Sequence, residues 1–388
     1  MRTVSWQRSM SAHQFFMWKD YQNLSSGDII FVLDRASDLI TKEVSLEELH
    51  NLGSMIFLGG FKWASSFSIL TSNSDAIHVF GGFRNSWYFF PLILFAVFRN
   101  IKVAVINEPY STSSIGYFQE EADWWARLKV KARPFLYDFM AQLLNRITRK
   151  VQPCFLPISL LAREQFIRAG FPLDSLYPFG YFVPRQSADG GRRADEPSKA
   201  LRLVFVGSLL TTKGLDIAIK PVKKLCLDGF DVSLDIYGHG DSKRFLPSPS
   251  DCVKYKGPLP PQEVQAVMAG YDLLILPSRH DGWGVVINEA LLQGVPVIIS
   301  DKVGAKCLVE SSGSGLIFES ENIEDLTRKL LELLQQPEKL EEMRRKARLV
   351  GDAILPAAGA SYLLDVFLFH FYHKGQRPSA LWTGSKII

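Results

Sequence analysis

The sequence predicts an α/β protein made of two Rossmann-like domains, each built on a parallel β-sheet. First, its 388 residues exceed one ordinary domain and suit two. Second, short apolar segments alternate with segments of helical periodicity, a pattern that is typical of βαβ units. Third, apolar runs such as Leu273–Leu276 are continuous, as expected of strands that are buried on both faces of a sheet.

The second half of the chain shows this alternation most clearly. Its expected strands cover 201–206, 232–237, 253–256, 271–276, 295–300 and 315–318, and the helices expected between them include 214–227, 261–269 and 285–293. The first half repeats the scheme, with candidate strands over 3–7, 28–33, 54–58, 76–80 and 102–106. Because ligands of such sheets bind at the carboxyl ends of the strands, we expect the two sheets to face each other across a cleft.

The boundary between the halves is predicted at residues 186–200, which are polar and lack periodicity. This linker separates a first domain, residues 1–185, from a second domain, residues 201–355. Residues 356–388 are expected to form a helical tail that packs back on the first domain.

The composition excludes several classes of protein. Hydrophobic residues make up 47% and charged residues 22%, which excludes a disordered or fibrous chain. The four cysteines form no Cys-x-x-Cys pair, so neither a disulfide framework nor a structural zinc site is expected. No signal peptide is visible, and the most apolar stretch, 87–98, is about half as long as a bilayer requires. We therefore expect a cytoplasmic protein, soluble or peripheral on the inner membrane face.

The net charge of +4 lies entirely in the first half. Residues 1–185 hold 19 Lys and Arg against 15 Asp and Glu, whereas residues 186–388 hold 25 of each kind. This excess is too small to favour nucleic acid as a partner. Residues 126–150 hold seven basic residues and one acidic residue, with apolar positions 136, 139/140 and 143/144 at helical spacing. Such a helix either lies on an anionic membrane surface or packs its apolar stripe on the sheet.

The segment 276–290 is the most informative for function, because a buried strand, a glycine turn and a helix expected from about Trp283 follow one another there. Its two acids, Asp281 and Glu289, lie eight residues apart, which is roughly 9–12 Å along a helix. The first helix amides, near Gly284 and Val285, can bind a diphosphate. One acid can then bind sugar hydroxyls and the other a ribose diol. Alternatively, Asp281 caps the helix and Glu289 is a solvated surface residue.

Three more turns follow predicted strands at the same edge of the second sheet. In the turn 207–214, Lys213 stands at the mouth of a helix, where its ammonium group can stabilise a diphosphate. In the turns 238–240 and 257–259, Gly238 and Pro258 can flank a nucleotide base. Each turn also has an ordinary interpretation, with Lys213 as a surface lysine and the glycine segments as plain turns.

These motifs make residues 201–350 resemble the retaining glycosyltransferases of family 4, which have the GT-B fold. The shared elements occur in order: a strand followed by Gly-x5-Lys-Gly, a Tyr-Gly-x-Gly turn, the Gly257-Pro258 turn, and an acid and a glutamate with seven residues between them. The resemblance implies that Glu289 binds the ribose of a nucleoside diphosphate sugar and that Asp281 holds its sugar. The other residues that it implies at the donor site are Gly282, Trp283, Gly284, Val285, Gly207, Ser208, Gly238 and Pro258.

Two positions depart from the family pattern: Ser208 stands where an arginine usually helps the lysine to hold the diphosphate, and Asp281 stands where the family usually has glutamate. The first domain resembles the family only loosely, since residues 9–14 replace its glycine-rich loop. His13 in this segment either contacts a phosphate or the acceptor, or belongs to an ordinary helix cap. Glu108 either orients the acceptor hydroxyl, acts as its base, or is an ordinary loop acid. Asp281, Lys213, Glu108 and His13 form the predicted catalytic set.

The sequence therefore predicts an enzyme that transfers a sugar from a nucleoside diphosphate sugar to a hydroxyl of a glycan or lipid-linked saccharide. The resemblance implies retention of anomeric configuration and a role in polysaccharide or cell-envelope glycan synthesis. We expect no cofactor and no metal, because no Asp-x-Asp motif occurs to hold a metal-bound diphosphate. Two rival hypotheses stay open, namely a non-catalytic GT-B scaffold that binds membranes or a partner protein, and a sugar-nucleotide epimerase.

Overall fold

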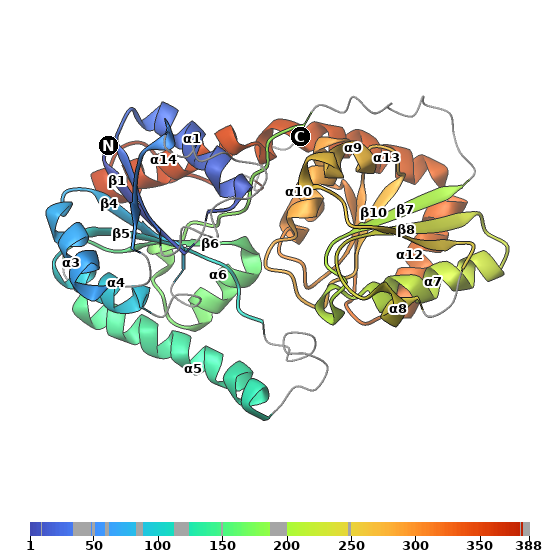
Figure 1. Ribbon diagram of the computed structural model, residues 1–388, viewed down its shortest axis with the longest axis horizontal. Coiled ribbons are helices and arrows are strands. Elements are labelled where there is room, and N and C mark those ends of the chain that lie inside the picture. The colour runs from blue at the N-terminus through green and yellow to red at the C-terminus, as the bar shows by residue number, and fades with distance from the viewer. Residues whose placement is uncertain are drawn as a thin grey trace. The chain divides into compact units, whose positions relative to one another are not determined.

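The computed structural model describes residues 1–8, 10–33, 48, 51–58, 62–82, 88–111, 124–148, 150–186, 200–246, 250–380 and 382. The chain divides into two compact units (Figure 1). The first unit consists of Met1–Tyr110, Ala132–Pro184 and Leu355–Leu381. The second consists of Ser111–Lys131, Arg185–Ile354 and Trp382–Ile388. Most of the predicted linker, 187–199, lies outside the described residues.

The first unit contains a six-stranded sheet in the order β3-β2-β1-β4-β5-β6, and all of its pairings are parallel. Its strands are β1 (Thr3–Gln7), β2 (Ile29–Leu33), β3 (Ser54–Phe57), β4 (Ile77–Phe80), β5 (Lys102–Asn107) and β6 (Cys154–Pro157). The first five lie within one residue of the predicted strands. The sequence analysis missed β6, a four-residue strand that ends in proline.

The helices of the first unit are α1 (Ala12–Ser25), α3 (Trp63–Ser72), α4 (Phe89–Phe98), α5 (Trp124–Ile147), α6 (Ser159–Arg168), the 3₁₀ turn η1 (Leu173–Ser175) and α14 (Pro356–Tyr372). The part of α5 up to Lys131 is assigned to the second unit. The apolar α4 packs into the core with β4 and β5, as expected for the most apolar stretch of the sequence. No helix in the described part of the chain is long and apolar enough to cross a membrane.

The helix α14 packs against α1 although more than 300 residues separate them in the sequence (Figure 1). The rings of Tyr21 and Phe367 lie 6.0 Å apart. Gly359 permits a close approach, because a Cβ atom there would lie 2.3 Å from the ring of Phe182. Beyond the helix, Arg377 donates hydrogen bonds to three backbone carbonyls around η1 and stacks on Tyr177 at 4.5 Å. The tail is therefore an integral part of the first unit.

A buried histidine stands in the core of this unit. Trp6 donates its indole proton to Nδ1 of His78 at 3.0 Å, so the His78 proton sits on Nε2 and is donated to the carbonyl of Asn73 at 2.9 Å. Burial lowers the pKa of His78 to about 4. This side chain is a satisfied neutral core residue.

The second unit contains a six-stranded parallel sheet in the order β12-β11-β10-β7-β8-β9. Its strands are β7 (Leu201–Val206), β8 (Val232–Tyr237), β9 (Val253–Gly257), β10 (Leu273–Leu276), β11 (Val297–Ser300) and β12 (Gly315–Phe318). Its helices are η2 (Thr211–Lys213), α7 (Leu215–Leu227), α8 (Ser242–Phe245), η3 (Pro261–Glu263), α9 (Val264–Met268), α10 (Val285–Leu292), α11 (Lys306–Ser312), α12 (Ile323–Gln335), α13 (Pro337–Val350) and η4 (Gly351–Ile354).

Two strands of this sheet begin two residues later than predicted, each for a local reason. Before β10, Asp272 anchors the strand entrance, since its carboxylate accepts from the backbone N–H of Arg202 at 2.9 Å. Before β11, the N–H of Val295 donates to the carbonyl of Ala290 at 2.9 Å and so closes the end of α10. Hydrogen bonds, and not the end of an apolar run, therefore set where β10 and β11 begin.

Candidate functional site

Each sheet reverses its strand order once, between β1 and β4 in the first unit and between β7 and β10 in the second. Ligands of open α/β sheets bind at such switch points, outside the carboxyl ends of the strands. The predicted site residues follow this rule. His13 and Glu108 lie at the carboxyl edge of the first sheet, and Lys213 and Asp281 lie on the two sides of the switch point of the second.

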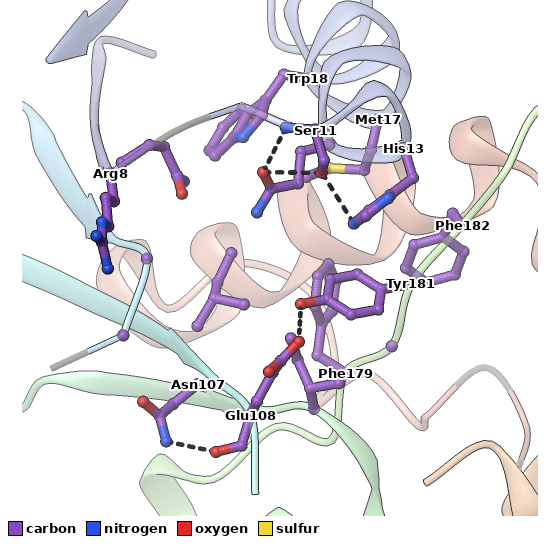
Figure 2. Close-up of a pocket in the computed structure, with 17 residues that line it drawn as sticks. Arg8, Ser11, His13, Met17, Trp18, Asn107, Glu108, Phe179, Tyr181 and Phe182 are labelled. Atoms are coloured by element: carbon purple, nitrogen blue, oxygen red, sulfur yellow. Dashed lines mark hydrogen bonds between the residues drawn. The ribbon is translucent and has the colours of Figure 1, made fainter. Parts of the chain in front are cut away.

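A cavity of about 490 Å³ opens at the carboxyl edge of the first sheet (Figure 2). Residues at or just after the ends of β1, β4, β5 and β6, the first turns of α1 and the segment 179–182 line it. They are Gln7, Arg8, Ser11, His13, Gln14, Met17, Trp18, Gly81, Gly82, Ile106, Asn107, Glu108, Ile158, Phe179, Gly180, Tyr181 and Phe182. The mixture of amide, hydroxyl, carboxylate and aromatic groups suits a ligand rich in hydroxyls.

Two glycines after β4 make room for polar side chains in this cavity. A Cβ atom on Gly81 would lie 2.3 Å from the amide oxygen of Gln7, and one on Gly82 would lie 3.0 Å from the amide oxygen of Asn107. Gly82 also has a φ of +82°. Gly81-Gly82 directly follows the predicted strand 76–80, so a glycine pair in the sequence marks this loop.

His13 lies in the helix-cap segment at the start of α1 and also lines the cavity. The side-chain oxygen of Gln14 accepts from the backbone N–H and from the hydroxyl of Ser11, each at 3.1 Å. Since that hydroxyl is used as a donor, Nε2 of His13 donates to its oxygen at 2.9 Å. Burial lowers the pKa of His13 to about 4. The imidazole is therefore neutral at neutral pH and supplies no positive charge for a phosphate.

Glu108 directly follows β5, and its side chain reaches the cavity (Figure 2). Tyr181 donates its hydroxyl proton to Oε1 of Glu108 at 2.5 Å, and the ring of Tyr181 packs edge-on against His13 at 4.4 Å. Asn107 donates to the Glu108 carbonyl at 2.8 Å. The predicted acid is thus held by a tyrosine 73 residues away in the chain, which no sequence motif had indicated.

In the second unit, Lys213 and Asp281 form an ion pair. The Lys213 ammonium donates to Oδ2 of Asp281 at 2.6 Å, and the side chains are 26% and 14% exposed. The sequence analysis assigned the two residues to different parts of the donor without expecting them to meet. Gly214 makes the approach possible, because it has a φ of +68° and a Cβ atom there would lie 2.0 Å from the Pro277 carbonyl.

The helix α10 begins at Val285 with Gly284 as its N-cap, as in the expected helix 285–293 but two residues after the start near Trp283 that was used for the acid spacing. Gly284 has a φ of +87°, which favours glycine. Helical rise therefore applies only to the second half of the interval between Asp281 and Glu289, so the predicted span of roughly 9–12 Å rested on a wrong helix start. Glu289 is half-buried in the second turn of α10.

Asp281 does not cap α10, contrary to the alternative hypothesis. Its Oδ1 accepts from the N–H of Trp283 at 3.4 Å, and its backbone pairs with Lys302 and Gly304. Within the described residues no side chain caps α10, and the N–H of Ile287 donates to the Gly284 carbonyl at 2.9 Å, so the amides of Val285 and Val286 are the ones left for an anion.

Trp283 was predicted at the donor site, and its side chain is buried. The indole is 2% exposed, donates to the side chain of Asn288 at 2.8 Å and packs against Trp382 at 5.4 Å. Its carbonyl accepts from Ala305 at 2.8 Å. Trp283 therefore holds the turn in place, whereas its neighbours Gly282 and Val285 stay half-buried at the sheet edge.

The other predicted donor residues lie in turns whose backbone hydrogen bonds continue those between the strands. Gly207 bonds to the carbonyl of Tyr237 at 3.0 Å, and Gly238 bonds to that of Gly257 at 3.0 Å. A Cβ atom on Gly238 would lie 1.7 Å from the Gly207 carbonyl, so these two turns can pack together only with glycine. Ser208 and Pro258 are exposed at the same edge.

Two arginines that the sequence analysis did not single out lie around η2. Arg279 donates to Asp216 at 2.7 and 2.8 Å and pairs with Glu321, so its charge is already neutralised, and these hydrogen bonds raise its pKa. Arg244 is exposed and donates to the hydroxyl of Thr211 at 2.7 Å. Arg244 of α8 therefore contacts Thr211, two residues before Lys213 in the chain. It supplies a cation to the turn in which Ser208 replaces the family's arginine.

Solved structures of similar shape define the fold. Sucrose-phosphate synthase from Thermosynechococcus elongatus matches with a TM-score of 0.67 and 12% identity over 96% of this chain and 100% of that chain. Anabaena HepE in complex with UDP and glucose matches with a TM-score of 0.64 and 14% identity over 95% and 99%. The chain has the GT-B fold, with two parallel Rossmann-like sheets.

Sequence similarity is found for the second half of the chain. Residues 192–350 match the family model of the glycosyl transferases group 1. The amylovoran biosynthesis glycosyltransferase AmsK of Erwinia amylovora is 29% identical over 192 residues, which are 46% of this chain and 47% of the relative. The chain thus spans about half the length of the curated relatives that it matches.

Proposed function

We propose that this protein transfers a sugar from a nucleoside diphosphate sugar to a hydroxyl group of a glycan or lipid-linked saccharide. The observation that carries the proposal is the Lys213–Asp281 pair at the switch point of a group 1 glycosyl transferase domain. The name of the relative AmsK supports a role in polysaccharide or cell-envelope glycan synthesis.

The donor would bind along the turns after β7, β8 and β10. Glu289 accepts hydrogen bonds from the ribose, Asp281 holds hydroxyls of the sugar, and the first amides of α10 face the diphosphate. Lys213 stabilises the same diphosphate. Arg244, which contacts Thr211, also binds the diphosphate. It replaces the arginine that the family has at the position of Ser208.

The chemical step breaks the bond between the anomeric carbon and the diphosphate oxygen, and the electron pair leaves with the diphosphate. Negative charge grows on that group, and Lys213 and the α10 amides stabilise it where it develops. The acceptor hydroxyl attacks from the face that the diphosphate leaves, so configuration is retained, and its proton passes to the departing phosphate oxygen. No metal or other cofactor takes part in this scheme.

The acceptor would bind in the cavity of the first unit. Glu108 accepts a hydrogen bond from the attacking hydroxyl and orients it, while Tyr181 fixes the carboxylate. His13 lines the same cavity as a neutral side chain. Amide and aromatic groups around them suit a sugar, and a lipid-linked saccharide would be presented at a membrane surface.

A ligand panel tests the proposal. Thermal unfolding is followed with UDP, GDP, ADP and their sugars, and a nucleotide at a hundred times its dissociation constant should stabilise the protein by about 2.7 kcal/mol. One base should be preferred, and transfer to an acceptor should need the matching sugar nucleotide. A protein that binds none of them would be the non-catalytic scaffold. Interconversion of free sugar nucleotides without an acceptor would instead indicate an epimerase.

A further inference from the structure

Only some of the apolar residues of α5 lie on the face of the helix that packs against the first unit. Tyr137, Met140, Ala141 and Leu144 are buried in the core of the first unit. Asn107 donates to the hydroxyl of Tyr137 at 2.9 Å, which ties the helix to the end of β5. Packing on the sheet, one of the two hypotheses for this segment, therefore holds for positions 140 and 144.

The outer face of α5 is also apolar. Phe135 is 74% exposed, Phe139 is 59% exposed and Leu136 is 47% exposed. Phe135 and Phe139 are one turn apart and therefore point to the same side of the helix. Two aromatic side chains left in water on one helix indicate a surface that is covered when the protein works.

Basic residues flank these aromatic residues on the same helix. Lys131 stands one turn before Phe135, and Arg146 stands two turns after Phe139, and both are exposed. Lys150, just beyond the helix, is exposed as well. Over residues 126–150 the sequence has one acid, Asp138, and seven basic residues. The outer face therefore combines apolar bulk with positive charge.

We propose that this outer face of α5, made of Lys131, Phe135, Leu136, Phe139 and Arg146, docks on an anionic lipid bilayer. The aromatic rings would enter the boundary between headgroups and acyl chains, and the basic side chains would bind lipid phosphates. A second copy of the chain fits less well, because a symmetric contact would bring two positively charged faces together. Docking needs neither donor nor acceptor, so it stands or fails independently of the proposed transfer reaction.

Flotation with vesicles tests this interaction in the full chain without nucleotide. Vesicles of phosphatidylcholine alone are compared with vesicles of equal parts phosphatidylglycerol and phosphatidylcholine. The protein should float only with the anionic vesicles, and binding should weaken as salt rises. Failure to bind anionic vesicles at low salt would overturn the proposal.

Two pairs of substitutions separate charge from apolar contact. Lys131→Glu with Arg146→Glu should weaken binding to anionic vesicles by at least about 30-fold, because each cation contributes about fivefold and its reversal adds repulsion. Phe135→Ser with Phe139→Ser should weaken it by about tenfold or more. All four side chains are exposed or lie at the surface, so the unfolding midpoint should stay unchanged.

Matched controls carry the same changes on other helices. Leu24→Ser with Leu227→Ser removes exposed leucines from α1 and the end of α7, and Lys220→Glu with Lys224→Glu reverses exposed charges on α7. Both controls should bind vesicles as the parent protein does. If the control variants lose as much vesicle binding as the test variants, net charge or general hydrophobicity explains the binding, and the proposed face of α5 does not. A dimer that only Phe135→Ser with Phe139→Ser abolishes would assign the face to a second copy and overturn the proposal.

Discussion

The two units share a sheet topology but place different chemistry at their switch points. The second unit has a direct ion pair between Lys213 and Asp281, with the exposed Arg244 nearby. The first unit has a cavity in which a neutral His13 and a single carboxylate, Glu108, are held by hydrogen bonds. The difference teaches that one topology can serve two ligands, because a charged diphosphate suits the second site, whereas the first site, which Arg8 also lines, offers mainly hydrogen-bonding groups to a hydroxyl-rich ligand.

Loss of the lysine in the second unit should have the largest effect. Lys213→Ala should lower the transfer rate by about 100-fold or more and weaken donor binding much less, because the diphosphate gains charge in the transition state. Steady-state kinetics and calorimetric titration of the nucleotide measure the two effects. Lys220→Ala, which removes an exposed lysine of α7, is the control. Equal turnover of Lys213→Ala and the parent enzyme would remove Lys213 from the mechanism.

The ribose contact should come next in size. Glu289→Ala should weaken nucleotide binding by roughly 1.5–3 kcal/mol, because two ribose hydroxyls lose a charged acceptor. Calorimetric titration of the preferred nucleoside diphosphate measures this loss. Glu324→Ala on α12, another exposed carboxylate of the same unit, should bind as before. If Glu289→Ala also binds unchanged, the ribose lies elsewhere.

A smaller effect is expected in the first unit. Tyr181→Phe should raise the KM for the acceptor by about 2- to 12-fold, because one hydrogen bond that orients Glu108 is lost. Donor affinity should stay constant, which separates the two sites. Tyr362→Phe is the control, since that buried hydroxyl has no hydrogen-bond partner among the described residues. A change in donor affinity with Tyr181→Phe would contradict the assignment of the acceptor to the first unit and of the donor to the second.

The last effect concerns stability in weak acid and is measured on unfolding, not on function. Burial depresses the pKa of His78 and of His13 to about 4, below the value near 6.5 of the unfolded chain. Their contribution to stability is therefore complete above pH 6.5 and is lost as the pH falls from there to about 4. Unfolding midpoints measured across this range should decline, and less steeply in His78→Gln. The same slope in both proteins would contradict the burial of a neutral His78.

Much of the fold followed from local signals in the sequence. The continuous apolar run Leu273–Leu276 marked β10, because strands buried on both faces need apolar side chains on both, whereas β7 and β8 are apolar segments interrupted by Arg202 and Asp235. Glycines marked the turns after them. The strand β6 was not predicted, because four residues that end in proline show no periodicity that distinguishes a strand from a loop.

The sequence by itself determined the order of strands and helices, the acids and the lysine at the edge of the second sheet, and the excess of basic residues in the first half. Only the tertiary structure decided which side chains meet. Lys213 and Asp281 are 68 residues apart, and Glu108 and Tyr181 are 73 apart, so no periodicity connects them. The parallel sheets bring such residues together because every strand ends at the same edge, and burial then sets which groups carry charge.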